Sequence, residues 1–112
     1  MARVLRGEIR WTKLSPARGH ERAGRRPVLV ISENVFNERS GTVIALALTS
    51  QEPRAGFPLT LELSDLALPR RSWVKISQVR TLAAERLGRR IGRAGAEEMA
   101  NVVDGLIQIV GK

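Results

Sequence analysis

The chain has 112 residues, enough for one hydrophobic core, and we predict a single domain over residues 1–112. Lysine and arginine number 19 against 11 acidic residues, a net charge of +8 that suits an anionic polymer as partner. The sequence contains no cysteine, which excludes disulfides, thiolate metal sites and cysteine nucleophiles. It shows neither a signal peptide nor an apolar run of membrane-spanning length, so we expect a soluble cytoplasmic protein with no membrane partner.

Short strands and loops alternate along the first half of the chain. Residues 7–13 (GEIRWTK) partly alternate apolar and polar side chains, with Ile9 and Trp11 on one face, which predicts a strand. Residues 27–32 (PVLVIS) and 42–49 (TVIALALT) are too short for typical helices and rich in β-branched side chains. We therefore predict two central strands that are buried on both faces.

The second half continues this pattern and ends in a helix. Residues 57–63 and 71–79 alternate as strands do, 82–87 suggest a helical turn, and 88–93 resemble a further strand. Residues 96–110 carry apolar side chains at helical spacing, although Gly105 costs such a helix about 1 kcal/mol. Five or six strands and one terminal helix predict a mainly β, α+β fold built as a small, partly closed barrel.

Positive charge is concentrated just before the strand at 27–32. This segment contains the only histidine, His20, together with Arg18, Arg22, Arg25 and Arg26. RNA suits such a site, because each 2′-hydroxyl lies beside a phosphorus atom that it can attack. Arginine can neutralise charge on the phosphate oxygens, and histidine is the side chain that titrates nearest neutral pH. Arg26 would then stabilise charge or act as an acid, although solvated loop arginines and an inert histidine explain the segment equally well.

Three other features have two interpretations each. Trp11 and Trp73 could stack on unpaired bases, but packing in the core or between subunits is the commoner role. The basic segment 86–93 could contact a second phosphate or simply keep a sheet edge soluble. Thr49 at the end of a strand is by default a residue of high β-propensity.

Other kinds of active site have little support in the sequence. The glutamates near His20 are scattered, so we predict no metal site. The glycines match neither a phosphate-binding loop nor a dinucleotide fingerprint, and we predict no cofactor. A serine hydrolase would need its nucleophile on a strand–turn–helix elbow, for which there is no candidate.

Four blocks in order resemble the MazF/PemK/Kid family of toxin endoribonucleases from bacterial toxin–antitoxin systems. They are RGEIRWTKLSPARGHERAGRRPVLVIS at 6–32, ALTS at 47–50, KISQVRTL at 75–82 and RLGRRIGR at 86–93, which leads into the last helix. The resemblance runs from residue 7 to about residue 110. It implies an SH3-like barrel of the MazF/PemK/CcdB toxin type with a C-terminal helix, assembled as a homodimer.

The resemblance also implies an activity and partners. The implied reaction is metal-independent cleavage of single-stranded RNA, chiefly mRNA, at short motifs, leaving a 2′,3′-cyclic phosphate and a 5′-hydroxyl. The implied inhibitor is an acidic, partly disordered antitoxin of the MazE type that wraps the toxin dimer and covers its RNA groove. Both partners are anionic, which suits the net charge of +8.

Site residues follow from the same alignment of motifs. Arg26, in the RPVLV block, corresponds to a residue assigned to proton transfer and transition-state stabilisation. Thr49, in the LTS block, corresponds to a residue that binds the scissile phosphate. His20 matches a histidine that some branches use to stabilise the transition state. These three are the predicted catalytic residues, and the predicted RNA-binding residues are Arg18, Arg22, Arg25, Ser50, Lys75, Ser77 and Gln78.

Two positions depart from the family pattern. Ser77 occupies a place where some members have an acidic residue proposed as the general base, preceded two positions earlier by a cation that Lys75 matches. The identity of the proton acceptor therefore stays open. It is His20 or Arg26, or the chain has no obvious acceptor. Arg10 occupies a position that is commonly aromatic, with Trp11 one place later, which indicates a local change of register or an altered dimer or RNA face.

Two rival functions remain open at this point. A non-catalytic SH3-like barrel that binds RNA or protein would show salt-dependent RNA affinity and no cyclic-phosphate product. A toxin that inhibits DNA gyrase, as fold-related toxins do, would act in a supercoiling assay.

Overall fold

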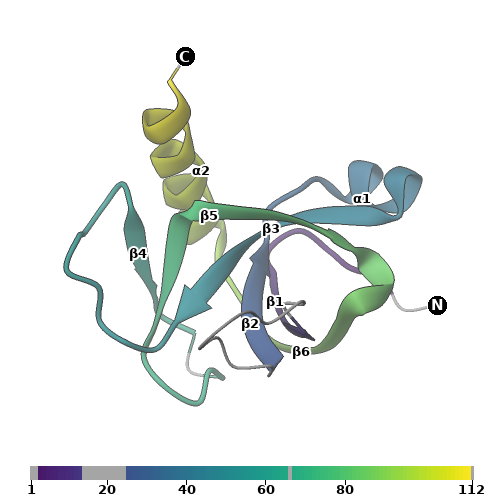
Figure 1. The fold of residues 1–112 in the computed structure, drawn as a ribbon, viewed down its shortest axis with the longest axis horizontal. Coiled ribbons are helices and arrows are strands. Elements are labelled where there is room, and N and C mark those ends of the chain that lie inside the picture. Colours follow the sequence, from purple (N-terminus) through teal and green to yellow (C-terminus); the bar gives the residue numbers. More distant parts are fainter. Residues whose placement is uncertain (1–2, 14–24, 66, 112) are drawn as a thin grey trace, which may run out of the picture.

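The structure is a computed structural model that describes residues 3–13, 25–65 and 67–111. Along the chain its elements are β1 (Glu8–Lys13), β2 (Arg25–Val30), α1 (Asn34–Ser40), β3 (Thr42–Thr49), β4 (Thr60–Leu63), β5 (Ser72–Ala83), the 3-10 turn η1 (Ala84–Arg86), β6 (Leu87–Arg93) and α2 (Ala96–Val110) (Figure 1). Neither α-helix in these ranges has the length and apolar character needed to cross a membrane.

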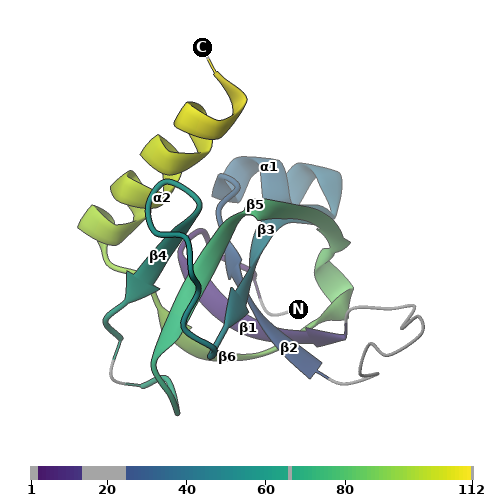
Figure 2. The same cartoon turned by 60° about the vertical axis from the view of Figure 1, so that its left-hand side comes forward.

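The six strands form one antiparallel sheet in the order β4-β5-β3-β2-β1-β6. The sheet curls, so that the far half of β5, η1 and β6 curve round toward β1, while α2 packs beside β4 and β5 (Figures 1 and 2). The predicted mainly β barrel with a C-terminal helix is confirmed.

The two middle strands are buried on both faces, as predicted. Because successive strand residues point to opposite faces, β2 and β3 contribute to two separate clusters. One contains Leu29, Leu46 and Leu48 together with Met99 and Val102 of α2. The other contains Val28, Val30, Val43, Ala45 and Leu82. This two-sided burial fixes the register of the strands that carry the candidate site.

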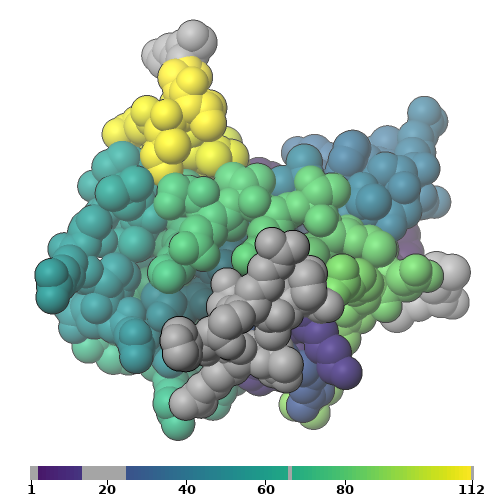
Figure 3. Space-filling view, in the orientation of Figure 1, coloured from purple at the N-terminus to yellow at the C-terminus, as the bar shows by residue number. Residues whose placement is uncertain are grey.

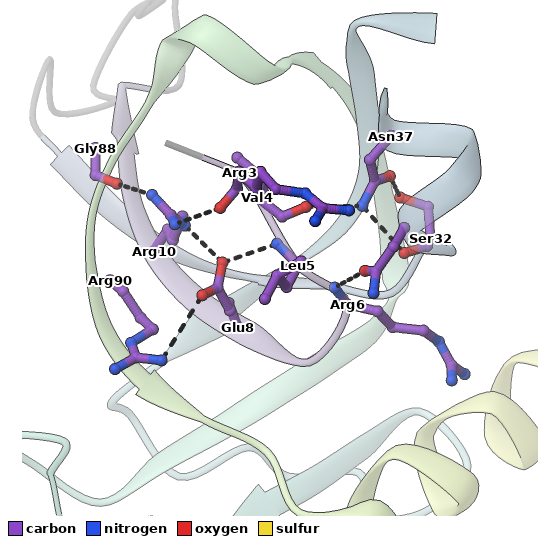
Figure 4. A network of polar contacts seen from close by, with 11 residues as sticks. Arg3, Val4, Leu5, Arg6, Glu8, Arg10, Ser32, Asn37, Gly88 and Arg90 are labelled. Atoms are coloured by element: carbon purple, nitrogen blue, oxygen red, sulfur yellow. Dashed lines mark hydrogen bonds and ion pairs between the residues drawn. The ribbon is translucent and has the colours of Figure 1, made fainter. Parts of the chain in front are cut away.

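Helix α1 was not predicted. Its large apolar side chains, Val35 and Phe36, are exposed, and its one buried residue is Asn37. The Asn37 amide accepts a hydrogen bond from the Ser32 hydroxyl and donates to the carbonyls of Ser32 (3.2 Å) and Val4 (3.4 Å) (Figure 4). A helix anchored by one amide has no apolar stripe from which periodicity could detect it.

Strand boundaries differ from the prediction around β4 and β5. The strand expected at 57–63 begins only at Thr60, because Leu59 lies in a turn in which its N–H donates to the carbonyl of Gly56 (3.0 Å). The strand expected at 71–79 continues to Ala83, so the expected helical turn at 82–87 shrinks to η1.

Strand β5 bends between its two halves. Leu48 of β3 pairs with Val74, and Leu46 pairs with Val79. Between these two pairs β5 contains more residues than β3, which is an irregularity in the strand pairing. The bend lets the first half of β5 pair with β4 and the second half continue along β3.

Candidate functional site

Three strand ends meet at one edge of the sheet. Val28 of β2 pairs with Ala47 of β3, and following this antiparallel register two residues further places Arg26 opposite Thr49. Thr49 in turn pairs with Trp73 near the start of β5. Alternate residues of a strand share a face, so Arg26 and Thr49 lie on the same side of the sheet.

A cavity of about 970 Å³ opens at this edge, and we call it the basic cleft. Its polar lining consists of Arg25, Arg26, Thr49, Ser50, Gln51, Arg70 and Ser72, and its apolar lining of Trp11, Pro27, Leu48, Leu68, Pro69 and Ile91. Three of the lining residues are arginines. In the described part of the chain, no acidic residue lines the cleft. The cleft therefore suits an anionic ligand that also presents flat or apolar surface.

The arginines of the basic cleft have few partners. Within the described ranges, the guanidinium groups of Arg26 and Arg70 make no hydrogen bond or ion pair. The guanidinium of Arg25 lies over the ring of Trp11, with its central carbon 5.6 Å from the ring centroid. Such groups keep their N–H donors for a phosphate, which arginine binds in a bidentate manner.

Thr49 is oriented by the turn that follows it. Its hydroxyl oxygen accepts the backbone N–H of Gln51 (3.2 Å), which is a common local contact of threonine after a strand. Since that contact uses a lone pair, the hydroxyl hydrogen remains able to donate to a ligand oxygen.

Other arginines of the sequence serve the fold. Arg71, next to Arg70, donates to both carboxylate oxygens of Glu62 (2.8 and 3.1 Å) and lies over the buried Trp73 ring (4.9 Å to its centroid). The hydrogen bond from Arg71 lowers the pKa of Glu62 below its usual value.

Arg10 is also committed to the fold. It donates to the buried carboxylate of Glu8 (3.0 Å) and to the carbonyls of Gly88 (3.0 Å) and Arg3 (3.1 Å) (Figure 4). Glu8 also accepts the N–H of Leu5 (2.9 Å). The departure at Arg10 is therefore an anchor for the segment before β1, not part of the basic cleft.

The structure brings together some of the predicted site residues. Arg25, Arg26, Thr49 and Ser50 line the basic cleft. Lys75, Ser77 and Gln78 lie at the bend of β5 and do not belong to its described lining; Lys75 is half-buried, and Ser77 and Gln78 are exposed. Arg18, His20 and Arg22 lie outside the described residues.

Arg70 and the position of Trp11 were missed by sequence reasoning. Arg70 comes two residues before β5, whose start pairs with the end of β3. The register pairs Thr49 with Trp73, three residues after Arg70, so strand pairing alone would have placed Arg70 only near this end of β3. Trp11 is half-buried on the cleft wall, whereas Trp73 is buried and packs in the core, as the commoner role predicts.

The chain is similar to known proteins over nearly its whole length. Residues 5–110 match the sequence profile of the family described as PemK-like, MazF-like toxin of type II toxin–antitoxin system. Endoribonuclease EndoA of Bacillus subtilis (strain 168) is 36% identical over 108 residues, covering 95% of this chain and 92% of that protein. The crystal structure of MazF from Deinococcus radiodurans superposes with a TM-score of 0.81 at 28% identity over 100% of both chains. A MazE–MazF structure from the same organism gives 0.80 at 26% identity over 98% of both.

Proposed function

This chain belongs to the family of PemK-like, MazF-like toxins of type II toxin–antitoxin systems, and from that premise we propose that it is an endoribonuclease. Its substrate is single-stranded RNA, chiefly mRNA, which it cleaves at short motifs in the bacterial cytoplasm without a metal ion. The observation that supports this most directly is that Arg26 and Thr49 line one cleft whose described lining is rich in arginine and free of acidic residues.

The proposed reaction is an internal transfer at phosphorus. The 2′-oxygen attacks the adjacent phosphorus, and the bond from phosphorus to the 5′-oxygen breaks, which yields a 2′,3′-cyclic phosphate and a 5′-hydroxyl. Negative charge grows on the non-bridging oxygens during attack, and the guanidinium of Arg26, which pairs with none of the described residues, is suited to stabilise it. Thr49 donates its hydroxyl hydrogen to one of these oxygens, while Arg25 and Arg70 hold neighbouring phosphates.

The two proton transfers need an acceptor for the 2′-hydroxyl and a donor for the leaving 5′-oxygen. We assign the acceptor to His20, because histidine titrates nearest the pH of the cell, and the donor role to Arg26. A histidine base predicts a cleavage rate that rises with pH through the neutral range and a profile that flattens in His20→Ala. The RNA beyond the scissile linkage is proposed to contact the remaining predicted RNA-binding residues, which are Arg18, Arg22, Ser50, Lys75, Ser77 and Gln78.

We further propose a homodimer and an acidic antitoxin of the MazE type as partners. Large apolar side chains are exposed on the end of α2 (Ile107, Ile109 and Val110) and on the segment before β4 (Phe57 and Leu59). Figure 3 shows α2, in yellow, next to the teal segment that contains β4. A second copy covering this surface would remove it from water, and sedimentation of the purified protein tests this assembly.

Incubating the purified protein with single-stranded RNA in EDTA and sequencing the new 5′ ends tests the proposed activity. We expect 5′-hydroxyl ends at one recurrent short motif and cyclic phosphates on the matching 3′ ends. RNA that is bound but stays intact would contradict the proposal in favour of a non-catalytic barrel. Inhibition of supercoiling without RNA cleavage would contradict it in favour of a gyrase inhibitor.

A further inference from the structure

A second hollow adjoins the basic cleft. It has a volume of about 400 Å³ and is lined by Trp11, Ala67, Pro69, Arg89, Arg90 and Ile91. Three of these residues, Trp11, Pro69 and Ile91, also line the basic cleft, so the two spaces share a wall. We call the smaller one the flanking hollow.

Positive charge continues from the cleft into the flanking hollow. Arg89 is exposed and, within the described ranges, its guanidinium makes no hydrogen bond or ion pair. Arg90 has one guanidinium nitrogen 3.8 Å from the buried Glu8 carboxylate (Figure 4), yet its side chain is 55% exposed. None of the residues described as lining the hollow is acidic. Among the described residues, an anionic group there would therefore meet Arg89, which has no ion pair, and the exposed side of Arg90.

Trp11 supplies a flat surface between the two spaces. It belongs to β1, which pairs with β2 on one side and β6 on the other, so its backbone is held in the sheet. Its indole ring can stack on a base of any identity.

We propose that the flanking hollow binds the nucleotide next to those held in the basic cleft, with its base against Trp11 and its phosphate at Arg89. This inference rests on the proposed endoribonuclease function. An acidic peptide could also pair with Arg89, but it would make no use of an aromatic ring between two arginine-lined spaces. The shared wall and the indole favour one continuous RNA strand.

Cleavage kinetics on substrates of graded length test the proposal. An oligonucleotide that contains the mapped motif is shortened one nucleotide at a time from each end, and Arg89→Ala is compared with the wild type. We expect Arg89→Ala to raise KM roughly fivefold on long substrates, the size expected of an exposed ion pair, with kcat unchanged. That difference should vanish when one particular end nucleotide is removed.

The matched control is Arg39→Ala, which removes the same charge from exposed α1, beyond the opposite end of β3. It should leave KM unchanged at every length. A KM increase in Arg89→Ala that is equal at all lengths, or no increase at all, would overturn the proposal.

Binding provides a readout that does not depend on cleavage. An RNA with a 2′-deoxy nucleotide at the scissile position lacks the nucleophile and cannot be cut. We expect the long form to quench tryptophan fluorescence more than the form that lacks the critical nucleotide, because Trp73 is buried and Trp11 is not. Quenching without cleavage of normal RNA would refute the proposed endoribonuclease activity. It would still support the flanking hollow as an RNA-binding site. Binding of an acidic peptide that depends on Arg89, with RNA binding independent of it, would overturn the proposal.

Discussion

Two cavities of nearly equal size differ in charge. The basic cleft, about 970 Å³, is lined by three arginines and, among its described residues, by no acid. A groove of about 890 Å³ beside α2 is lined by Arg6 and Arg93 but also by Glu33 and Asp104, over an apolar floor that includes Met99 and Val103. Volume therefore does not distinguish the candidate RNA site, whereas the ratio of arginines to carboxylates does.

The partners of the arginines explain this difference. In the α2 groove, Arg6 donates to the carbonyl of Ile31 (3.0 Å) and lies 3.9 Å from Glu33, so it joins the segment before β1 to the connection between β2 and α1. In the basic cleft, Arg26 and Arg70 have no such contacts within the described ranges. Like charges that have no counter-charge among the described lining residues repel one another, so this arrangement does not stabilise the folded state. A bound polyanion gives it a physical reason.

The largest expected effect is a loss of cleavage rate when an arginine is removed from the basic cleft but not when one is removed from the α2 groove. Arg26→Ala should reduce kcat/KM roughly 10²- to 10³-fold, the cost of removing one preorganised donor from a developing oxyanion. Arg93→Ala, in the α2 groove, removes the same charge and should leave the rate unchanged. Both rates are measured on the same oligonucleotide, with circular dichroism to check folding. Equal losses in the two variants would show that net charge alone determines activity.

Thr49→Val should have the next largest effect. The substitution keeps the shape of the side chain but removes the hydroxyl, and a hydrogen bond to a charged group is worth about 1.5–3 kcal/mol, or roughly 10- to 100-fold in kcat/KM. Thr49→Ser retains the hydroxyl and should keep most of the activity. If the serine and valine variants lose activity equally, the hydroxyl does not contact the phosphate.

The sequence was informative wherever burial is two-sided or periodic. The predicted strand 42–49 and helix 96–110 coincide with β3 and α2, because apolar side chains at these positions must leave water on both faces or along one stripe. The meeting of Arg26 and Thr49 follows from the pairing of β2 with β3. Strand register therefore gives the physical reason why these two residues, which the family resemblance assigns to one site, lie close together although they are far apart in the sequence.

The sequence could not show which arginines are free. Arg70 and Arg71 are neighbours, yet Arg71 is bound by Glu62, a residue of another strand, and only Arg70 reaches the basic cleft. Arg10 is fixed by carbonyls of Arg3 and Gly88, which no local pattern connects with it. Amino-acid composition cannot distinguish these arginines from one another, because tertiary structure determines which partners each of them has.

The sequence shows Gly105 only as a cost to the helix, and the structure adds a packing reason for glycine at this position. A Cβ at this position would lie 2.9 Å from the Ile76 Cδ1 and 3.1 Å from the Pro58 carbonyl oxygen, so α2 packs closely on β5 and on the segment before β4. We expect Gly105→Ala to lower the free energy of unfolding by about 1–3 kcal/mol through overpacking, despite its better helix propensity.

Urea unfolding measures that change. Asn101→Ala, at an exposed position of α2, is the control and should be neutral or stabilising. The cleavage rate of folded Gly105→Ala should equal that of the wild type, since α2 contributes no residue to the described lining of the basic cleft. A variant as stable as the wild type would contradict the close approach.

The smallest expected effect is on the pH dependence of the free energy of unfolding. It depends on Asp65, which precedes the turn that forms one wall of the basic cleft. The Asp65 carboxylate accepts the backbone N–H groups of Arg93 (2.6 Å) and Ala67 (2.8 Å), and these hydrogen bonds, that of Arg93 first, lower the pKa of Asp65. A carboxyl whose pKa is lower in the folded than in the unfolded state stabilises the fold above its unfolded pKa. That stabilisation is lost as the pH falls through the folded value.

Asp65→Asn removes this titration while keeping one amide oxygen as acceptor. Because Asp65 is only half-buried, we expect the variant to be less stable than the wild type at about pH 7 by under about 1 kcal/mol. The two unfolding free energies should converge only as the pH falls below the ordinary aspartate pKa and through the lower folded-state value, where the wild-type carboxyl becomes protonated. Glu85→Gln, which removes an exposed carboxylate from η1, is the control and should run parallel to the wild type. A constant gap between Asp65→Asn and the wild type at every pH would mean that the side chain acts through its shape and not through its charge.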